Sequence, residues 1–358
     1  MSSIIGNKIK VSIFGESHGD AIGVVIDGLP AGHKINFDFV HEEMRRRAPG
    51  QDSLSTSRVE KDIPKVLSGI FRERTTGAPL SAIIENNNTK SRDYSELKVK
   101  LRPSHCDYPA MIKYEGYNDY RGGGHFSGRL TALLVFAGAI CKEILKEYDV
   151  YIGAHIKSIG KIKDDGFDKV NIRKELLQEL REDRFPTLNK IISEEMKEEI
   201  LVVKALGDSI GGVIEGAVIN LPVGLGNPMF HSVESVLSHM LFSIPAVKGV
   251  EFGEGFNIST LRGSEANDQY YIEGEDIKTY SNNNGGILGG ITSGMPVTFS
   301  VAFKPTPSIA LPQKTVNMET KADDILEIKG RHDPCIVQRA VPVVECVTAI
   351  AILDMMIQ

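Results

Sequence analysis

The chain has 358 residues, of which 41% are apolar and 25% charged, so it is long enough for one large domain or two smaller ones. Its net charge of -6 argues against broad nucleic-acid binding, which requires a basic surface. Its longest apolar runs, such as residues 130–140, are far shorter than the roughly 20 residues that span a bilayer. Because the first residues also lack the pattern of a secretory signal, we expect a cytoplasmic protein.

The cysteines stand singly, without the spacing of a zinc site, at positions 106, 141, 335 and 346. We therefore expect reduced thiols and no metal centre. Basic residues concentrate locally in spite of the negative net charge: three arginines end at Arg47, and Arg121, Arg129 and Arg331 accompany glycine-rich or turn-like sequence. An acidic protein with such local basic clusters is suited to bind a small anion.

The first half of the chain begins with predicted strands. Residues 8–15 alternate apolar and polar side chains and residues 21–32 are rich in β-branched residues, so both are predicted strands, joined by the segment GESHG. Apolar side chains recur at helical spacing over residues 36–47, after a capping asparagine and with three arginines in the last turn, which predicts a helix. Further strands are predicted at residues 65–73 and 79–86.

A long stretch without apolar periodicity, residues 91–129, precedes a strongly predicted helix at residues 130–148. Loops of this length inside a compact domain are usually functional or disordered, and the several tyrosines in this one argue against disorder. Its last part, GGGHFSGR, leads into the helix start. Glycine-rich sequence in that position supplies backbone N–H groups for a phosphate.

The second half mixes both element types without a regular βαβ repeat. The charged residues 162–200 are predicted surface helices. Beyond them we expect strands at 209–222 and 297–304, a helix at 232–244 and a mostly buried helix at 338–358. No linker requires a domain boundary, so a single domain over residues 1–358 is expected.

Four short segments combine chemically active side chains with glycine or proline. His18 in GESHG is either a general acid or base, or a turn histidine satisfied by its neighbours. The same two interpretations hold for His105 in RPSHCD, where an arginine stands three residues earlier. In KGRHDPC, Asp333 precedes a proline, which disfavours a helix, and its carboxylate belongs either to a salt-bridged turn or to a proton relay.

The fourth segment, YRGGGHFSGR, surrounds three consecutive glycines with Arg121, His125, Ser127 and Arg129. It matches neither of the common glycine patterns of nucleotide-binding sites. Glycines nevertheless permit close approach of a ligand to the backbone, and arginines suit a phosphate or a carboxylate. This segment therefore favours a binding function over a purely structural one.

In their order along essentially the whole chain, these segments closely resemble the chorismate synthase family. The resemblance rests on GESHG, RRRAPGQ, RPSHCDY, DYRGGGHFSGR, GGILGGITSG, KPTPSI and GRHDPC. Enzymes of this family use reduced FMN to convert 5-enolpyruvylshikimate 3-phosphate to chorismate, the last step of the shikimate pathway that leads to aromatic amino acids. The reaction is an anti-1,4-elimination of phosphate without net redox change, so the resemblance implies a carbon–oxygen lyase.

The resemblance also implies three catalytic residues. His18 would protonate the departing phosphate, and His105 would lie near the flavin and protonate or stabilise its reduced form. Asp333 matches the aspartate that assists proton removal from C6 of the substrate through flavin N5. The glycines on either side of His18 are interpreted as the feature that lets its ring reach the bound phosphate.

Further residues would hold the two ligands. The arginines that would bind the phosphate and carboxylates of the substrate are Arg46, Arg47, Arg129 and Arg331. The residues that would lie against the flavin are His125, Phe126, Ser127, Pro245, Ala246, Gly289, Lys304, Pro305, Thr306, Pro307, Ser308 and Arg331. A substrate with two carboxylates and a phosphate requires several arginines, which agrees with the local basic clusters.

Two positions depart from the family pattern. Many relatives carry arginine where His125 stands, and many carry an arginine shortly after the arginine-rich turn, where this chain has Ser53. The fold that the resemblance implies is of the α+β class, a β-α-β sandwich with helices between antiparallel sheets. It also implies a homotetramer.

Two other functions are compatible with the residues themselves. A metal-independent phosphomonoesterase would release phosphate without flavin and without a diene product, and a non-catalytic flavin- or anion-binding module would bind without turnover. For the synthase we expect dependence on an external source of reduced FMN, since the length leaves no obvious reductase domain. Whether the protein reduces flavin with NADPH is left open by the sequence.

Overall fold

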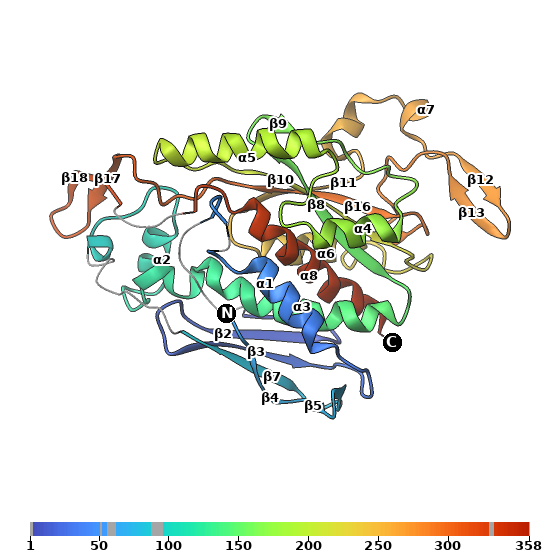
Figure 1. Cartoon of the computed structure of the whole chain (residues 1–358), viewed down its shortest axis with the longest axis horizontal. Coiled ribbons are helices and arrows are strands. Elements are labelled where there is room, and N and C mark those ends of the chain that lie inside the picture. The colour runs from blue at the N-terminus through green and yellow to red at the C-terminus, as the bar shows by residue number, and fades with distance from the viewer. Residues whose placement is uncertain (1–2, 51, 56–61, 87–95, 329–332, 358) are drawn as a thin grey trace.

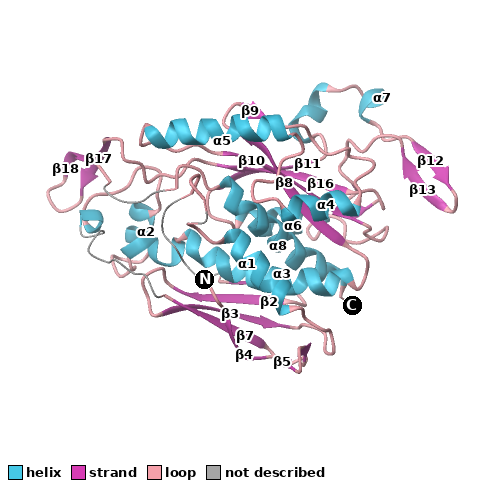
Figure 2. Cartoon of the chain, in the orientation of Figure 1, coloured by secondary structure: helices cyan, strands magenta, loops and turns pink. Residues whose placement is uncertain are grey.

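The computed structural model of the chain describes residues 3–50, 52–55, 62–86, 96–328 and 333–357. Two five-stranded antiparallel sheets enclose a layer of helices, and two more helices cover the outer face of one sheet (Figure 1). Figure 2 shows the same layers by element type, with helices between the two groups of strands. The expected β-α-β sandwich of the α+β class is confirmed.

The first sheet has the strand order β1-β2-β3-β7-β4. Its members are β1 (Ile4–Ile5), β2 (Lys10–Gly15), β3 (Ala21–Asp27), β7 (Leu80–Glu85) and β4 (Lys65–Ser68). Alternate residues of its central strand, Ile22, Val24 and Ile26, are completely buried against the helices, as a half-buried strand requires. The predicted strands in this half of the chain are confirmed, and GESHG is the connection between β2 and β3.

The second sheet has the order β11-β16-β10-β8-β9. It consists of β11 (Val247–Phe252), β16 (Val297–Phe303), β10 (Gly212–Ile219), β8 (Tyr151–Ile159) and β9 (Ile162–Lys163). The strands β10 and β16 confirm two predictions, whereas β8 was not predicted. Both faces of β8 are covered, so its sequence lacks the alternation of polar and apolar residues that marks a one-sided strand.

The helices between the sheets are α1 (Phe37–Arg47), α3 (Thr131–Lys146) and α8 (Val337–Met356), with α6 (Val233–Phe242) packed against α8 and β11. The outer helices are α4 (Lys174–Glu182) and α5 (Lys190–Ala205) (Figure 1). All six correspond to predicted helices. The predicted cap of α1 is also confirmed, because the Asn36 side chain accepts from the N–H groups of Asp38 and Phe39.

The two central helices, α3 and α8, approach each other very closely at one glycine. A Cβ at Gly138 would lie 2.2 Å from the carbonyl oxygen of Cys346. Only a residue without a side chain permits this separation of the two backbones. The apolar core runs continuously from the first sheet through these helices to the second sheet.

Several short elements complete the fold. They are α2 (Asp107–Lys113), α7 (Gly263–Ala266) and the strand pairs β5 (Ile70–Phe71) with β6 (Arg74–Thr75), β12 (Tyr270–Glu273) with β13 (Asp276–Thr279), β14 (Ile287–Leu288) with β15 (Ile291–Thr292) and β17 (Gln313–Asn317) with β18 (Ala322–Leu326). The β12–β13 hairpin projects from the body (Figure 1). Among the described helices, none combines the length and apolar composition that a membrane crossing requires.

Candidate active site

A cavity of about 880 Å³ collects segments from distant parts of the chain. Its walls come from the N-terminal strands, the end of α1, the glycine loop before α3, the loop after α6, the segment after β16 and the start of α8. The predicted site residues that line it are Arg47, His105, His125, Phe126, Ser127, Arg129, Pro245, Ala246, Lys304, Thr306, Pro307, Ser308 and Asp333. The fold thus gathers most of the predicted site in one place.

The GESHG connection packs directly against the glycine loop. The N–H of Ser17 donates to the carbonyl of Gly124 at 3.1 Å. The imidazole of His18 is buried behind Gly122. Gly122 lines the cavity, whereas His18 does not line it. A Cβ at Gly122 would lie 2.3 Å from Nδ1 of His18, so a glycine, here with φ of +59°, is required between the ring and the cavity.

This packing revises the interpretation of the glycines next to His18. Gly19 has ordinary backbone angles, and a Cβ there would meet its nearest atom at 3.5 Å, a normal contact. Gly15 is required, but for a different reason: its φ is +99° and a Cβ would lie 2.5 Å from the carbonyl oxygen of Ala21. The glycine that makes room for the ring is Gly122, about a hundred residues further along the chain.

Two arginines at the cavity wall share one buried carboxylate. Asp62 Oδ2 accepts from Arg47 Nη1 at 2.8 Å, and Asp62 Oδ1 accepts from Arg129 Nη1 at 2.7 Å. Burial alone would raise the pKa of Asp62, but the two guanidinium charges outweigh it and hold the pKa below its ordinary value. Asp62 therefore stays ionised and keeps two cations side by side at the wall.

The same arginines are held by further contacts. Arg47 donates from Nε to Thr131 Oγ1 at 3.1 Å and from Nη2 to the carbonyl of Gly128 at 2.9 Å. Arg129 donates from Nε to Asn86 Oδ1 at 2.6 Å. Because the amide nitrogen of Asn86 also donates to the carbonyl of Gly19 at 2.8 Å, it connects Arg129 with the GESHG loop.

His105 belongs to a compact charged cluster in the loop before α2. Its Nδ1 lies 2.6 Å from Asp107 Oδ1, and Arg102 donates to both oxygens of the same carboxylate. Burial alone would raise the pKa of Asp107, but the hydrogen bonds from Arg102 and His105 hold it well below its ordinary range. The carboxylate is thus permanently charged beside the imidazole.

Among the described residues, the triplet His105, Cys106 and Asp107 brings metal-type donor atoms within 4.8 Å of one another. Arg102 opposes a cation there, since its guanidinium already contacts both carboxylate oxygens. Burial also raises the pKa of the Cys106 thiol, which disfavours the thiolate that binds metals. The cluster is better suited to orient a histidine than to hold a metal.

His125 uses both ring nitrogens within the protein. Nδ1 lies 2.9 Å from the carbonyl of Gly15 and Nε2 lies 3.0 Å from Oγ of Ser3. A carbonyl only accepts, so the proton is on Nδ1, and Nε2 accepts from the Ser3 hydroxyl in the neutral ring. His125 therefore connects the N-terminal segment at Ser3 with the end of β2 at the cavity.

Asp333 is held by an arginine of α8. Arg339 Nη1 lies 2.5 Å from Asp333 Oδ2, and its Nε donates to the carbonyl of Arg47 at 3.1 Å. Both residues line the cavity. Arg339 thus links the candidate carboxylate with the helix that carries Arg47.

Two lysines add positive charge to another wall. Lys248 on β11 and Lys304 after β16 both line the cavity. Partial burial and the neighbouring charge of Lys248 lower the pKa of Lys304. Lys304 also donates to the carbonyl of Ser104, which joins the segment after β16 to the loop that carries His105.

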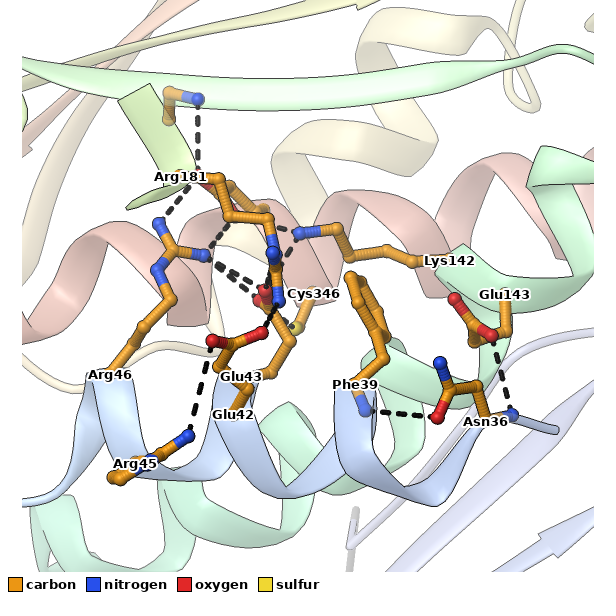
Figure 3. Close-up of polar contacts among 12 residues, drawn as sticks. Asn36, Phe39, Glu42, Glu43, Arg45, Arg46, Lys142, Glu143, Arg181 and Cys346 are labelled. Carbon is orange, nitrogen blue, oxygen red and sulfur yellow. Dashed lines mark hydrogen bonds and ion pairs between the residues drawn. The ribbon is translucent and has the colours of Figure 1, made fainter. Parts of the chain in front are cut away.

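Arg46 does not take part in this site, although it precedes Arg47 in α1. Its guanidinium is buried between Glu43 and Glu345, at 2.9 and 2.7 Å, and Lys142 and Arg181 join the same cluster (Figure 3). Burial alone would lower the pKa of Arg46, but these two carboxylates raise it overall. Arg46 therefore does not belong to the set of arginines expected to bind the substrate, which we call the substrate clamp. It contributes instead to the packing of α1 on α3 and α8.

Two other predicted site residues, Gly289 and Pro305, are not among the described residues that line the cavity. Gly289 forms the turn between β14 and β15, with φ of +61°. Pro305 lies between the lining residues Lys304 and Thr306 but does not line the cavity itself. Arg331 lies outside the described residues, as does the segment after Ser55 up to residue 61.

Sequence reasoning missed several residues of the site. They are Asp62, Asn86, Arg102, Asp107, His239, Lys248 and Arg339. Arg102 and Asp107 stand in the motif RPSHCD, so the sequence already showed that they lie close to His105 along the chain. The others belong to no motif. Only the fold brings His239, Lys248 and Arg339 to the cavity, and Asp62 and Asn86 to the arginines at its wall.

The fold thus surrounds one cavity with arginine, lysine and histidine, a lining suited to an enzyme that acts on a small polyanion. The chorismate synthase family model matches residues 9–357. The chain is 47% identical over 350 residues to the chorismate synthase of Pyrococcus abyssi, which covers 98% of this chain and 96% of that one. It is 46% identical over 355 residues to the chorismate synthase of Dehalococcoides mccartyi, with 99% and 96% covered.

A solved crystal structure of a chorismate synthase superposes with a TM-score of 0.76 at 29% identity, and the match covers 98% of this chain and 92% of that one. The chain therefore belongs to the chorismate synthase family, whose members are carbon–oxygen lyases that depend on flavin.

The residues of the cavity fit a flavin phosphate together with an anionic substrate. Among the lining residues, Phe126, Phe242, Ile244, Pro245 and Ala246 offer apolar surface suited to a flat aromatic ring system. Arginines and lysines line the same cavity and suit phosphate and carboxylate groups. A volume of about 880 Å³ is at the upper end of small-molecule sites, as a shared site for two ligands requires.

Proposed function

We propose that this protein converts 5-enolpyruvylshikimate 3-phosphate to chorismate and inorganic phosphate with reduced FMN. The observation that carries the proposal is that residues of RRRAPGQ, RPSHCDY, DYRGGGHFSGR and KPTPSI, together with Asp333, line one cavity with both apolar and cationic side chains. In the reaction, C6 of the substrate loses a proton, the C3–O bond to phosphate breaks, and the diene forms. When bound, reduced flavin supplies the electron density that assists loss of phosphate from the allylic position.

Arg47 and Arg129 bind the anionic groups of the substrate in this proposal. Asp62 holds both guanidinium groups, so their orientation is fixed before the substrate arrives. Preorganised arginines lose little further side-chain freedom on binding and can hold a phosphate or a carboxylate with two parallel hydrogen bonds. Arg331 remains a proposed member of this clamp.

His18 donates a proton to the departing phosphate, and Asp333 assists removal of the proton from C6. The ring of His18 lies directly behind Gly122, so a phosphate held against Gly122 is within its reach. Asp333 is oriented by Arg339, which keeps its carboxylate at the cavity wall.

The flavin lies against the apolar lining residues in this proposal. Phe126, Pro245 and Ala246 would hold the ring system, and Ser127, Lys304, Thr306, Pro307 and Ser308 would hold the rest of the cofactor. His105 would meet the flavin with Nε2. Gly289 stays in the proposed flavin set from the family resemblance alone, since it does not line the cavity of the described chain.

We further propose that the protein is a cytoplasmic homotetramer that takes reduced FMN from an external source. Large apolar side chains on the β12–β13 hairpin are well exposed, including Ile272 at 78%. Association of chains would remove this surface from water.

The function is tested by an anaerobic assay with 5-enolpyruvylshikimate 3-phosphate that follows chorismate absorbance and phosphate release. The three conditions are reduced FMN, oxidised FMN with NADPH, and no flavin. We expect chorismate and phosphate in equal amounts with reduced FMN alone. Activity with NADPH would add a reductase function, phosphate without chorismate would indicate a phosphomonoesterase, and absence of turnover would indicate a binding module.

A further inference from the structure

We propose that Asp107, itself held by Arg102, is a positioning residue for His105: it keeps the imidazole proton on Nδ1 and so leaves Nε2 as the atom that meets the ligand. This inference rests on the proposed function, in which His105 contacts the flavin. It concerns a contact between residues of one loop, which fixes how His105 is presented to the cavity.

The carboxylate of Asp107 is almost fully engaged by Arg102. Oδ2 accepts from the backbone N–H of Arg102 at 3.0 Å and from its Nε at 2.8 Å, while Oδ1 accepts from its Nη2 at 2.7 Å. Oδ1 also lies 2.6 Å from Nδ1 of His105. Three donors of one arginine therefore fix the plane of the carboxylate, and the carboxylate in turn fixes the ring of His105.

These contacts decide which ring nitrogen carries the proton. An ionised carboxylate only accepts hydrogen bonds, so a contact of 2.6 Å from Oδ1 requires a proton on Nδ1. Nη2 of Arg102 lies 3.0 Å from the same Nδ1 and would donate to it in the other tautomer. That tautomer would leave the Nδ1 lone pair facing the charged Oδ1 at the shorter distance of 2.6 Å, so the contact with Asp107 favours the proton on Nδ1.

The other edge of the ring points toward the glycine loop at the cavity. A Cβ at Gly123 would lie 3.5 Å from both Cε1 and Nε2 of His105. The loop is further secured because Lys304 donates to the carbonyl of Ser104, which has φ of +59°. Nε2 is thus an acceptor toward the ligand in the neutral ring and a donor in the protonated ring, and both states keep the bond to Asp107.

Replacement of Asp107 by asparagine reverses this arrangement. Two donors of Arg102 converge on the position of Oδ2, so the amide oxygen is favoured there and the NH₂ group occupies the position of Oδ1. An NH₂ group facing Nδ1 of His105 requires that nitrogen to accept, which moves the proton to Nε2. The same reversal is known for the aspartate of serine-protease triads.

The tautomer is measured directly by solid-state ¹⁵N NMR of protein labelled at histidine, above the ordinary pKa of imidazole and without substrate or flavin. The His105 signals are those lost in His105→Gln. We expect protonated Nδ1 in the wild type and protonated Nε2 in Asp107→Asn. A wild-type ring protonated at Nε2, or an unchanged tautomer in Asp107→Asn, would overturn the proposal.

A kinetic cycle separates positioning from a merely structural role. We expect Asp107→Asn to lower kcat by about 10²-fold in the wild-type background, the usual contribution of one proton-transferring group. In the His105→Gln background the same substitution should lower kcat less than about two-fold, because the residue through which it acts is gone. Equal losses in both backgrounds would contradict the proposal.

Asp168→Asn is the matched control. Asp168 also accepts from a backbone N–H, that of Val170 at 3.1 Å, but it does not line the cavity, and its substitution should leave kcat unchanged. The NMR measurement needs no turnover. If the wild type fails to form chorismate, the proposed function fails, while the tautomer of His105 still decides whether Asp107 positions it.

Discussion

At the scale of single residues, the cavity depends on close packing that leaves no room for a larger side chain. It also depends on an arginine that several hydrogen bonds hold in one orientation. Gly122 separates His18 from the cavity, and Arg47 contacts a carboxylate, a hydroxyl and a carbonyl with one guanidinium. Each feature requires one particular residue type, so each can be tested by a conservative substitution.

Gly122→Ala should lower kcat by at least about 10²-fold, since its methyl group would occupy the space of the His18 ring and its φ is unfavourable for alanine. The measurement is the steady-state rate with reduced FMN. Gly19→Ala is the control in the neighbouring loop, where a Cβ makes only ordinary contacts. Equal activity of Gly122→Ala and the wild type would remove His18 from the proposed mechanism.

Arg47→Lys should raise KM for the substrate by roughly 10-fold or more with a smaller effect on kcat. Lysine keeps the charge, but its single ammonium group cannot reproduce the fork that contacts Asp62, Thr131 and Gly128 together. Arg45→Lys is the matched control, because Arg45 lies on the exposed side of α1. An unchanged KM in Arg47→Lys would exclude this arginine from the clamp.

At the scale of elements, buried charges hold helices and loops in place. In α1, consecutive arginines serve different purposes: Arg47 reaches the cavity, while Arg46 joins Glu43, Glu345 and Lys142 in the helical layer (Figure 3). In the second sheet, His155 on β8 contacts Glu215 on β10. We expect these clusters to stabilise the fold, because they hold in place the elements that also form the cavity.

Arg46→Gln should reduce the free energy of unfolding by about 3 kcal/mol, because it leaves two buried carboxylates with less compensating charge. KM for the substrate should stay within about two-fold of the wild type, since Arg46 does not line the cavity. Urea unfolding and steady-state kinetics measure the two effects. A selective rise in KM with unchanged stability would return Arg46 to the substrate clamp.

Glu215 should make stability depend on acid. Burial alone would raise its pKa, but hydrogen bonds from His155 and Lys157 lower it from 4.5 to about 2. A carboxyl with a depressed pKa stabilises the fold above its unfolded value, and that contribution is lost as the pH falls from 4.5 toward 2. Glu215→Gln should therefore be less stable at neutral pH and lose less stability across this interval in urea unfolding.

If the slope of stability against pH is the same in Glu215→Gln and in the wild type, the cluster of His155, Lys157 and Glu215 does not control acid unfolding. The control is Glu175→Gln, on the outer helix α4, which changes the same group away from this cluster.

At the scale of the whole molecule, exposed apolar side chains gather on the projecting hairpin of β12 and β13. Tyr270, Ile272, Ile277 and Tyr280 are all largely exposed, on an arm that extends from the body of the molecule (Figure 1). A surface of this kind usually marks an interface. It is the structural feature that best supports association of several chains.

Sedimentation should therefore give a mass four times that of the single chain. Ile272→Asp should produce smaller species, because a charge on the hairpin opposes burial of this arm. Asp276→Asn is the control on the same hairpin, where the change removes a charge instead. A monomeric wild type would refute the proposed tetramer, and an unchanged mass in Ile272→Asp would exclude the hairpin from the interface.

Much of the fold could be predicted from the sequence. The strands β2 and β3, the helices α1, α3 and α8 and the connecting GESHG segment follow from local periodicity and capping, which short stretches of chain encode. The strand β8 escaped prediction because it is covered on both faces, and the pairing order of the sheets is set by contacts between distant residues. The sandwich itself was expected from the family resemblance.

By itself the sequence determined the segments that carry the chemistry, since motifs such as GESHG, RPSHCD and RGGG are local and their residue types already indicate anion binding and proton transfer. Only the tertiary structure decided which residues face the ligand. Arg46 and Arg47 are neighbours in one motif, yet a helix turns by about 100° per residue, so one is buried among carboxylates while the other reaches the cavity. Likewise, Gly122 makes room for His18 and Asp62 joins Arg47 to Arg129 because folding brings distant segments into contact.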